Sequence, residues 1–172
     1  EQCRQAAASY IRSALPWIDY INAPDLDGEA TEMAHRLAAL VLKHHTKNEN
    51  MARPFGFVVG GETTVTLDMS NSGKGGRSQE LALAFALTMR DAGSSAPQQW
   101  AIIAGGTDGR DGPTDAAGGF ITSEQSFDRD AAKVALSTHH SYDYLRAYDQ
   151  LLRVGATGTN LADLVLVVAQ SS

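Results

Sequence analysis

Three glycine-rich stretches of the sequence, at positions 73–77, 105–115 and 155–160, carry side chains that could perform chemistry. The first ends in Arg77, whose guanidinium offers a rigid pair of donors to a carboxylate or a phosphate. It precedes an apolar run, Leu81–Leu87, that predicts a helix. We therefore expect the turn to present free backbone N–H groups to an anion at that helix N-terminus. A flexible turn followed by a solvated Arg77 is the alternative.

The second stretch carries Asp108, Asp111 and Asp115, and carboxylates are the oxygen ligands that suit Mg²⁺. Close carboxylates repel one another unless a cation lies among them. Aspartates also close turns with their own backbone, which is an equal alternative for each of the three. The third stretch offers hydroxyl and amide groups that bind phosphate oxygens or complete their own turn, those of Thr157, Thr159 and Asn160.

The elements that must position these loops follow from hydrophobic spacing and from glycine and proline breaks. Apolar positions predict helices at 2–14, 28–45, 81–92, 128–137 and 141–152, and strands at 55–59, 64–68, 100–104, 120–121 and 164–169. Because strands and helices alternate through short links, we predict an α/β fold with layered helices on a mixed, partly parallel sheet. The aspartate loop follows the strand 100–104, and ligands of open α/β sheets bind beyond such strand ends.

Composition excludes several classes of function. With 14 basic and 20 acidic residues the net charge of the chain is −6, which argues against non-specific binding of nucleic acid. The single cysteine, Cys3, cannot form an internal disulfide, so we expect a reducing, cytoplasmic location. No apolar run is long enough to span a membrane. The chain begins at Glu1, which is expected of a processed product or of a segment of a longer protein.

Familiar nucleotide-binding patterns are absent from the sequence. The dinucleotide fingerprint does not occur. The phosphate-loop pattern also fails, because Gly75 follows Lys74 where that pattern needs Ser or Thr. The pairs His44–His45 and His139–His140 are chain neighbours that do not share a helical face. We interpret them as surface or internally satisfied residues.

Four blocks, in this order along the chain, resemble class II glycerate kinase. They are Gly60–Val65, Gly75–Glu80, Gly106–Gly118 and Thr157–Leu164, and together they match the C-terminal leucine-rich (MOFRL) domain of that family. Asp27–Ala30 is similar to a helix start that closes the family's N-terminal domain. Three departures stand out: Ser78 replaces a usual Asn, His139–His140 replace a usual Asn-Asp, and Ala156 replaces a usual Pro.

The resemblance implies transfer of the γ-phosphoryl group of ATP to D-glycerate, giving 2-phosphoglycerate. It places Arg77 at the substrate carboxylate or the transferring phosphoryl group, and Asp108 and Asp111 at Mg²⁺ or the glycerate hydroxyl. Substrate and phosphate contacts are expected from Gly75, Gly76, Thr107, Thr157, Thr159 and Asn160. Glu62 and Glu80 are expected to hold the loops in place.

Members of the family are about twice as long, and their N-terminal Rossmann-like domain carries a lysine thought to act at the phosphates. Residues 1–53 then resemble the tail of that domain and 54–172 the MOFRL-type α/β domain, with the N-terminal kinase domain as partner and a possible homo-oligomer. We expect the polar stretch 46–54 to be a boundary, residues 54–170 to fold alone, and the chain alone to be incomplete for catalysis. A hydroxypyruvate reductase and a non-catalytic module stay open as alternatives.

Overall fold

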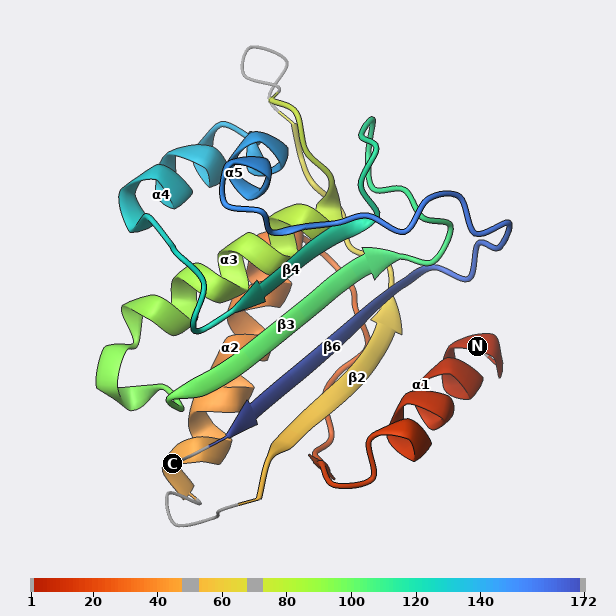
Figure 1. Ribbon diagram of the computed structural model, residues 1–172, viewed down its shortest axis with the longest axis vertical. Coiled ribbons are helices and arrows are strands. Elements are labelled where there is room, and N and C mark those ends of the chain that lie inside the picture. The colour runs from red at the N-terminus through yellow and green to blue at the C-terminus, as the bar shows by residue number, and fades with distance from the viewer. Residues whose placement is uncertain (1, 48–52, 68–72, 171–172) are drawn as a thin grey trace.

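The computed structural model describes residues 2–47, 53–67 and 73–170, which form one six-stranded sheet with helices packed on it (Figure 1). The strand order is β1-β2-β6-β3-β4-β5. Only β1 and β2 are parallel, and the other neighbours are antiparallel. The predicted α/β fold with a mixed, partly parallel sheet is thus confirmed. The strands are β1 (Asp19–Tyr20), β2 (Phe55–Gly61), β3 (Gln99–Gly106), β4 (Gly118–Thr122), β5 (Leu151–Leu152) and β6 (Asp163–Gln170).

The helices are α1 (Gln2–Ala14), α2 (Ala30–Lys47), α3 (Arg77–Asp91), α4 (Arg129–Ser137) and α5 (Ser141–Ala147), with a 3₁₀ turn η1 (Gly93–Ser95). Helices α2 and α3 lie side by side behind the sheet in Figure 1, and α1 lies beside β2. Helix α3 is buried nearly all round, which explains its Leu- and Ala-rich sequence. Its core contacts come from alternate residues of the central strands: Phe57, Ile102, Ile121, Val165 and Val167.

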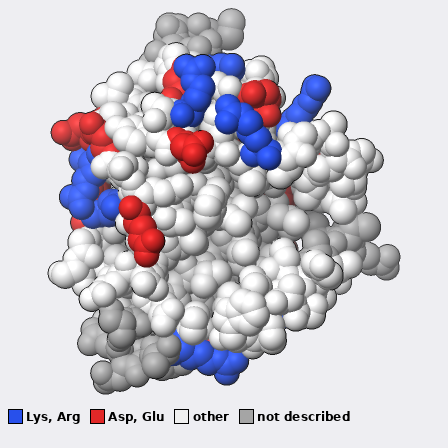
Figure 2. All heavy atoms as spheres, viewed as in Figure 1, with Lys and Arg blue, Asp and Glu red and all other residues white. Residues whose placement is uncertain are grey.

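The other face of the sheet carries apolar side chains as well. Ile103 pairs with Leu166, and Leu166 pairs with Val58, so the three residues form a row across neighbouring strands. Ile11 of α1 lines a shallow apolar pocket with this row. Figure 2 shows this side of the molecule with charged side chains gathered mainly at its rim. None of the helices in the described ranges is long and apolar enough to cross a membrane.

Two predicted elements are wrong. The helix predicted at 141–152 ends at Ala147, because Asp149 takes a left-handed φ of 54° and the chain then forms β5. The strand predicted at 64–68 is not one over its described part. Thr64 makes a single isolated bridge to Glu29, whose carboxylate accepts hydrogen bonds from the hydroxyl groups of Thr64 and Thr66. Asp68 lies outside the described residues.

The packing of α2 argues against the expectation that 54–170 folds alone. Met33, Leu37 and Val41 of α2 are at most 1% exposed, and they belong to the same core as α3 and the sheet. Removing α2 would expose that core to water. The boundary near residue 53 itself stays a prediction, and residues 48–52 lie outside the described part of the chain.

Candidate active site

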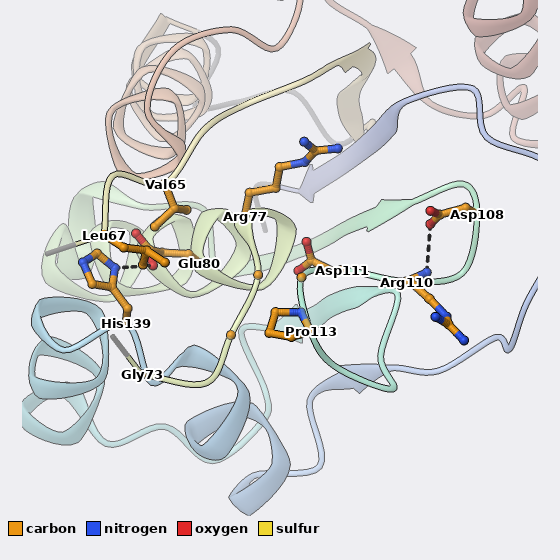
Figure 3. A pocket seen from close by; sticks show the side chains of 13 residues that line it. Val65, Leu67, Gly73, Arg77, Glu80, Asp108, Arg110, Asp111, Pro113 and His139 are labelled. Atoms are coloured by element: carbon orange, nitrogen blue, oxygen red, sulfur yellow. Dashed lines mark hydrogen bonds and ion pairs between the residues drawn. The ribbon is translucent and has the colours of Figure 1, made fainter. Parts of the chain in front are cut away.

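A cavity of about 480 Å³ lies at the N-terminus of α3 (Figure 3). Figure 3 shows Glu80 and His139 at one end of this cavity, Asp108 and Arg110 at the other, and Arg77 between them. A smaller polar pocket of about 160 Å³ shares Arg77, Asp108 and Arg110 with the cavity. The cavity is lined by Val65, Leu67, Gly73, Gly75, Gly76, Arg77, Glu80, Asp108, Arg110, Asp111, Gly112, Pro113 and His139.

The sheet brings these loops to one edge. Strands β2 and β3 both run antiparallel to β6, so they end on the edge where β6 begins. In the register of the sheet, Asp163 at the start of β6 lies opposite Gly61 of β2 and Gly106 of β3. The segment that follows β2, the aspartate loop after β3 and the start of β6 therefore meet beside the first turn of α3.

Arg77 is the first residue of α3, as predicted, and two carboxylates hold its guanidinium. Nε donates to Asp163 Oδ2 at 2.6 Å and Nη2 donates to Asp163 Oδ1 at 3.2 Å, while Nη1 donates to Glu62 Oε1. Burial works to lower the pKa of Arg77, but the hydrogen bonds and charges of Asp163 and Glu62 outweigh it and raise that pKa. Arg77 does not pair with Glu80, and Asp163 and Glu62 already occupy part of its guanidinium.

The carboxylate of Asp111 occupies the N-terminus of α3. Its Oδ1 accepts from the Ser78 N–H at 3.1 Å and its Oδ2 accepts from the Gln79 N–H at 2.8 Å. The expectation that these N–H groups are free for an anionic ligand is therefore wrong, because a side chain of the protein already caps them. Asp111 is 4% exposed, and burial raises its pKa to about 6 against the effect of the two N–H groups.

The glycine turn allows this close approach. A Cβ atom on Gly76 would lie 2.3 Å from Asp111 Cγ, and one on Gly75 would lie 2.3 Å from Ser141 Oγ. Gly112, in the aspartate loop, has a left-handed φ of 59° and also packs against this turn. Both Gly75 and Gly76 line the cavity, and their lack of a Cβ lets the aspartate loop and α5 pack closely; their predicted contacts with substrate or phosphate stay predictions.

Asp108 is half-buried, between the buried Asp111 and the exposed Asp115 of the same loop. Its Oδ1 accepts from the Arg110 N–H at 2.9 Å, which is the turn-forming alternative, and the residue lines both the cavity and the smaller pocket. Asp115 instead accepts a hydrogen bond from the Tyr142 hydroxyl at 2.6 Å, which lowers the pKa of Asp115. The three aspartates therefore have three different environments.

The third loop mainly braces the second. Thr107 Oγ1 donates to Ala162 O at 2.8 Å, and Thr157 Oγ1 donates to the carbonyl oxygen of Thr107. Thr159 donates its N–H to Thr157 Oγ1, so the Thr157 hydroxyl is used within the loops. Of the predicted phosphate contacts here, only Thr107 and Asn160 line the smaller pocket.

Glu80 forms a pair with His139 at the apolar end of the cavity. His139 Nδ1 lies 3.0 Å from Glu80 Oε2, and the Glu80 side chain is 6% exposed. Burial raises the pKa of Glu80, while the hydrogen bond and charge of His139 oppose that shift. Glu80 thus joins α3 to the turn between α4 and α5, and its role in holding the loops of an active site stays a prediction.

Sequence reasoning did not single out Asp163, Arg110 or His139 as members of the site. A charged residue directly before the apolar strand 164–169 was a signal for Asp163, since such a residue becomes buried only with a partner. Arg110 is exposed, and within the described ranges its guanidinium has no ion-pair partner. Nothing in the sequence links His139 to Glu80, which is 59 positions away.

The site offers few protein ligands for a metal ion. No group of three or more His, Cys, Asp or Glu side chains in the described part of the chain is arranged to hold one. Both Asp111 oxygens are occupied by backbone N–H groups, so Asp108 is the better candidate ligand. A single carboxylate suits Mg²⁺ when phosphate oxygens and water supply the other positions. Both assignments to Mg²⁺ stay predictions.

A family model described as the MOFRL family matches residues 55–163, which is more than half of the chain. The chain belongs to the MOFRL family. The glycine turn, the aspartate loop and Asp163 all lie within the matched MOFRL region. Its match begins at Phe55, the first residue of β2.

Two curated relatives of this MOFRL chain are named for the same activity. Glycerate 2-kinase of Pyrococcus horikoshii is 36% identical over 157 residues, which are 88% of this chain and 34% of that protein. D-glycerate 2-kinase of Thermotoga maritima is 34% identical over 146 residues, with 82% and 33% covered. Another relative, from Agrobacterium vitis, is 38% identical over 81% of this chain and 32% of its own length, and is provisionally named a hydroxypyruvate reductase.

Two crystal structures match the fold. A Pyrococcus horikoshii protein superposes with a TM-score of 0.78 at 32% identity, covering 98% of this chain and 38% of that one. Thermotoga maritima glycerate kinase gives a TM-score of 0.77 at 30% identity, with 96% and 39% covered. The MOFRL chain therefore spans about a third of the length of the curated relatives that it matches.

Proposed function

We propose that this chain is the MOFRL part of a glycerate kinase that transfers the γ-phosphoryl group of ATP to D-glycerate, giving 2-phosphoglycerate. The observation that carries the proposal is the placement of Arg77 on a cavity of about 480 Å³, facing a loop that presents Asp108. That volume is in the range of small-ligand sites. The names of the curated relatives support this reaction.

The residues of this chain would act by positioning and by charge. A guanidinium has five N–H donors, and three hydrogen bonds to carboxylates use part of that capacity. Two further N–H groups of Arg77 can therefore meet a carboxylate or phosphoryl oxygen. Because Asp163 fixes the guanidinium through two atoms, Arg77 is oriented before a ligand arrives, which lowers the entropic cost of binding.

Asp108 would hold Mg²⁺ or accept the hydrogen of the glycerate hydroxyl. When bound beside ATP, the metal ion supplies positive charge to the phosphate oxygens. Asp111 acts at one remove, because its carboxylate fixes the first turn of α3 and with it the backbone that carries Arg77. Phosphoryl transfer depends mostly on positioning and charge neutralisation, so this division of roles suits the reaction.

A chimeric enzyme tests the proposal. The corresponding third of Pyrococcus horikoshii glycerate 2-kinase is replaced by this chain, and ATP-dependent formation of 2-phosphoglycerate from D-glycerate is measured. We expect activity in the chimera, a loss of activity in its Arg77→Ala variant, and little or no activity in the 172-residue chain alone. A folded chimera that makes no product would contradict the kinase assignment. Full turnover by the isolated chain would contradict its incompleteness.

A hydroxypyruvate reductase is the second candidate, and the name of the Agrobacterium vitis relative is the observation that favours it. Such an enzyme needs a nicotinamide dinucleotide, and the sequence contains no fingerprint for one. Oxidation of NADH by the chimera with hydroxypyruvate, in the absence of ATP, would favour the reductase over the kinase.

A further inference from the structure

The two carboxylates that hold Arg77 differ in how firmly they are fixed. The Asp163 side chain is 6% exposed, makes two hydrogen bonds to the guanidinium, and belongs to a strand paired on both sides. The Glu62 side chain is 64% exposed and reaches Arg77 through Nη1 alone. It lies in the segment that follows β2. Asp163 is thus a fixed partner of Arg77, and Glu62 is one that can leave.

Glu62 also stands where an incoming anion would meet Arg77. Glu62, Arg77 and Asp163 all line the smaller polar pocket, beside Thr107 and Asn160. While Glu62 is in place, its negative charge offsets the positive charge of Arg77 and repels a ligand carboxylate or phosphate. An anion that binds Nη1 from this pocket must therefore either share this nitrogen with Glu62 or replace Glu62 there.

We propose that Glu62 is an exchangeable internal counter-ion, and that a carboxylate or phosphoryl group of the ligand takes its place on Arg77 while Asp163 stays bound. The proposal deepens the proposed function, on which it rests for the identity of the ligand. Without a ligand, Glu62 keeps the half-buried guanidinium paired. With a ligand, Glu62 returns to water and the ligand supplies an equivalent charge.

The energetics favour release of Glu62 from Arg77 over a permanent ion pair between them. An ion pair as exposed as that of Glu62 contributes little, because water solvates the free carboxylate nearly as well. Asp163, buried and bidentate, costs far more to release. The consequence is selectivity: only a ligand group with its own negative charge can displace Glu62, so a neutral analogue of the ligand gains nothing at Arg77.

Glu62→Gln tests the exchange, because it keeps the size of the side chain and removes the charge that competes. D-glycerate and inorganic phosphate are titrated separately into the 172-residue chain and followed through the backbone N–H signals of Arg77 and Ser78 in NMR spectra. We expect Glu62→Gln to bind at least one of them roughly two- to fivefold more tightly than the unaltered chain does. Glu124→Gln, an exposed acid beside the far end of β4, removes the same charge and should change nothing.

The outcomes separate the proposals. A gain with D-glycerate alone names the carboxylate as the exchanging group, a gain with phosphate alone names the phosphoryl group, and either one supports the exchange. The gain should vanish in an Arg77→Ala background. Unchanged or weaker binding in Glu62→Gln, an equal gain in Glu124→Gln, or no binding in any variant would overturn the exchange. Failure of the kinase assignment is seen separately, as absence of product in the chimera.

Discussion

Arg77 joins structure and ligand binding in one side chain, and substitution should reveal both roles. The helix that follows it is held by buried leucines, and from those alone little change in stability would be expected. Arg77→Ala, however, leaves Asp163 buried without its partner, and we expect a loss of roughly 2–3 kcal/mol in the free energy of unfolding, measured with urea. Arg77→Lys keeps the charge but loses the bidentate geometry, so we expect kcat/KM of the chimera to fall about ten- to a hundredfold.

Arg110→Ala is the matched control, because Arg110 lies on the same cavity and, in the described part of the chain, has no ion-pair partner. Its free energy of unfolding should be close to that of the unaltered chain. Equal stability of Arg77→Ala and Arg110→Ala would mean that the pair with Asp163 contributes nothing.

Asp111 should make stability depend on pH. Its pKa in the folded chain is raised to about 6, above an unfolded value of about 3.9. The folded state therefore binds the proton more tightly, and the contribution of this group to stability falls as the pH rises from about 4 to 6. The difference in unfolding free energy between the unaltered chain and Asp111→Asn should shift against the unaltered chain by roughly 2 kcal/mol between pH 4 and 7. A difference that is constant across this range would contradict the raised pKa.

Helix α3 shows what sequence can establish about one element. Its existence and the place of Arg77 at its start follow from an apolar run after a glycine turn, and both are confirmed. The residue that caps this helix cannot be predicted from the sequence, because the aspartate loop contains three aspartates. Only the packing shows that Asp111 is the one that accepts hydrogen bonds from the first turn of α3. The strand predicted at 64–68 has the alternation of a strand in its sequence, but in its described part Thr64 and Thr66 hydrogen-bond to Glu29 instead. The break before β5 occurs at Asp149, where the left-handed conformation has no glycine to signal it.

The contact between the glycine turn and the cap predicts a rescue. In Gly76→Ala the new Cβ would lie 2.3 Å from Asp111 Cγ, so the start of α3 must shift, and we expect a loss of roughly 1–3 kcal/mol in stability. In an Asp111→Ala background the carboxylate is gone and the same substitution should cost much less. The two costs are compared by chemical denaturation. Equal costs in both backgrounds would show that the clash is not what constrains Gly76.

At the scale of the molecule, the class of fold was predictable and the order of the strands was not. Alternating apolar segments indicate a layered α/β chain, but which strands pair depends on contacts between distant residues. The site shares this limit: its glycines, aspartates and Arg77 are visible as motifs, whereas the pairs Arg77–Asp163 and Glu80–His139 exist only after folding.

The shared core predicts how the chain responds to truncation. A chain of residues 54–172 lacks α2, whose Met33, Leu37 and Val41 are buried against α3 and the sheet, and we expect it not to unfold cooperatively. A chain of residues 15–172 lacks only α1, which lies beside β2, and should keep a cooperative transition. Circular dichroism during urea unfolding distinguishes the two. A sharp transition for 54–172 would show that α2 is dispensable.

The position of β6 also governs when the molecule can form during its synthesis. It is the last strand of the described chain, yet it lies between β2 and β3 and pairs with both along its length. While the ribosome is still translating the codons before residue 163, β2 and β3 have no strand to join them, and Arg77 has no Asp163. The nascent chain must therefore keep two apolar half-sheets apart from each other, and from neighbouring chains, until β6 emerges from the exit tunnel.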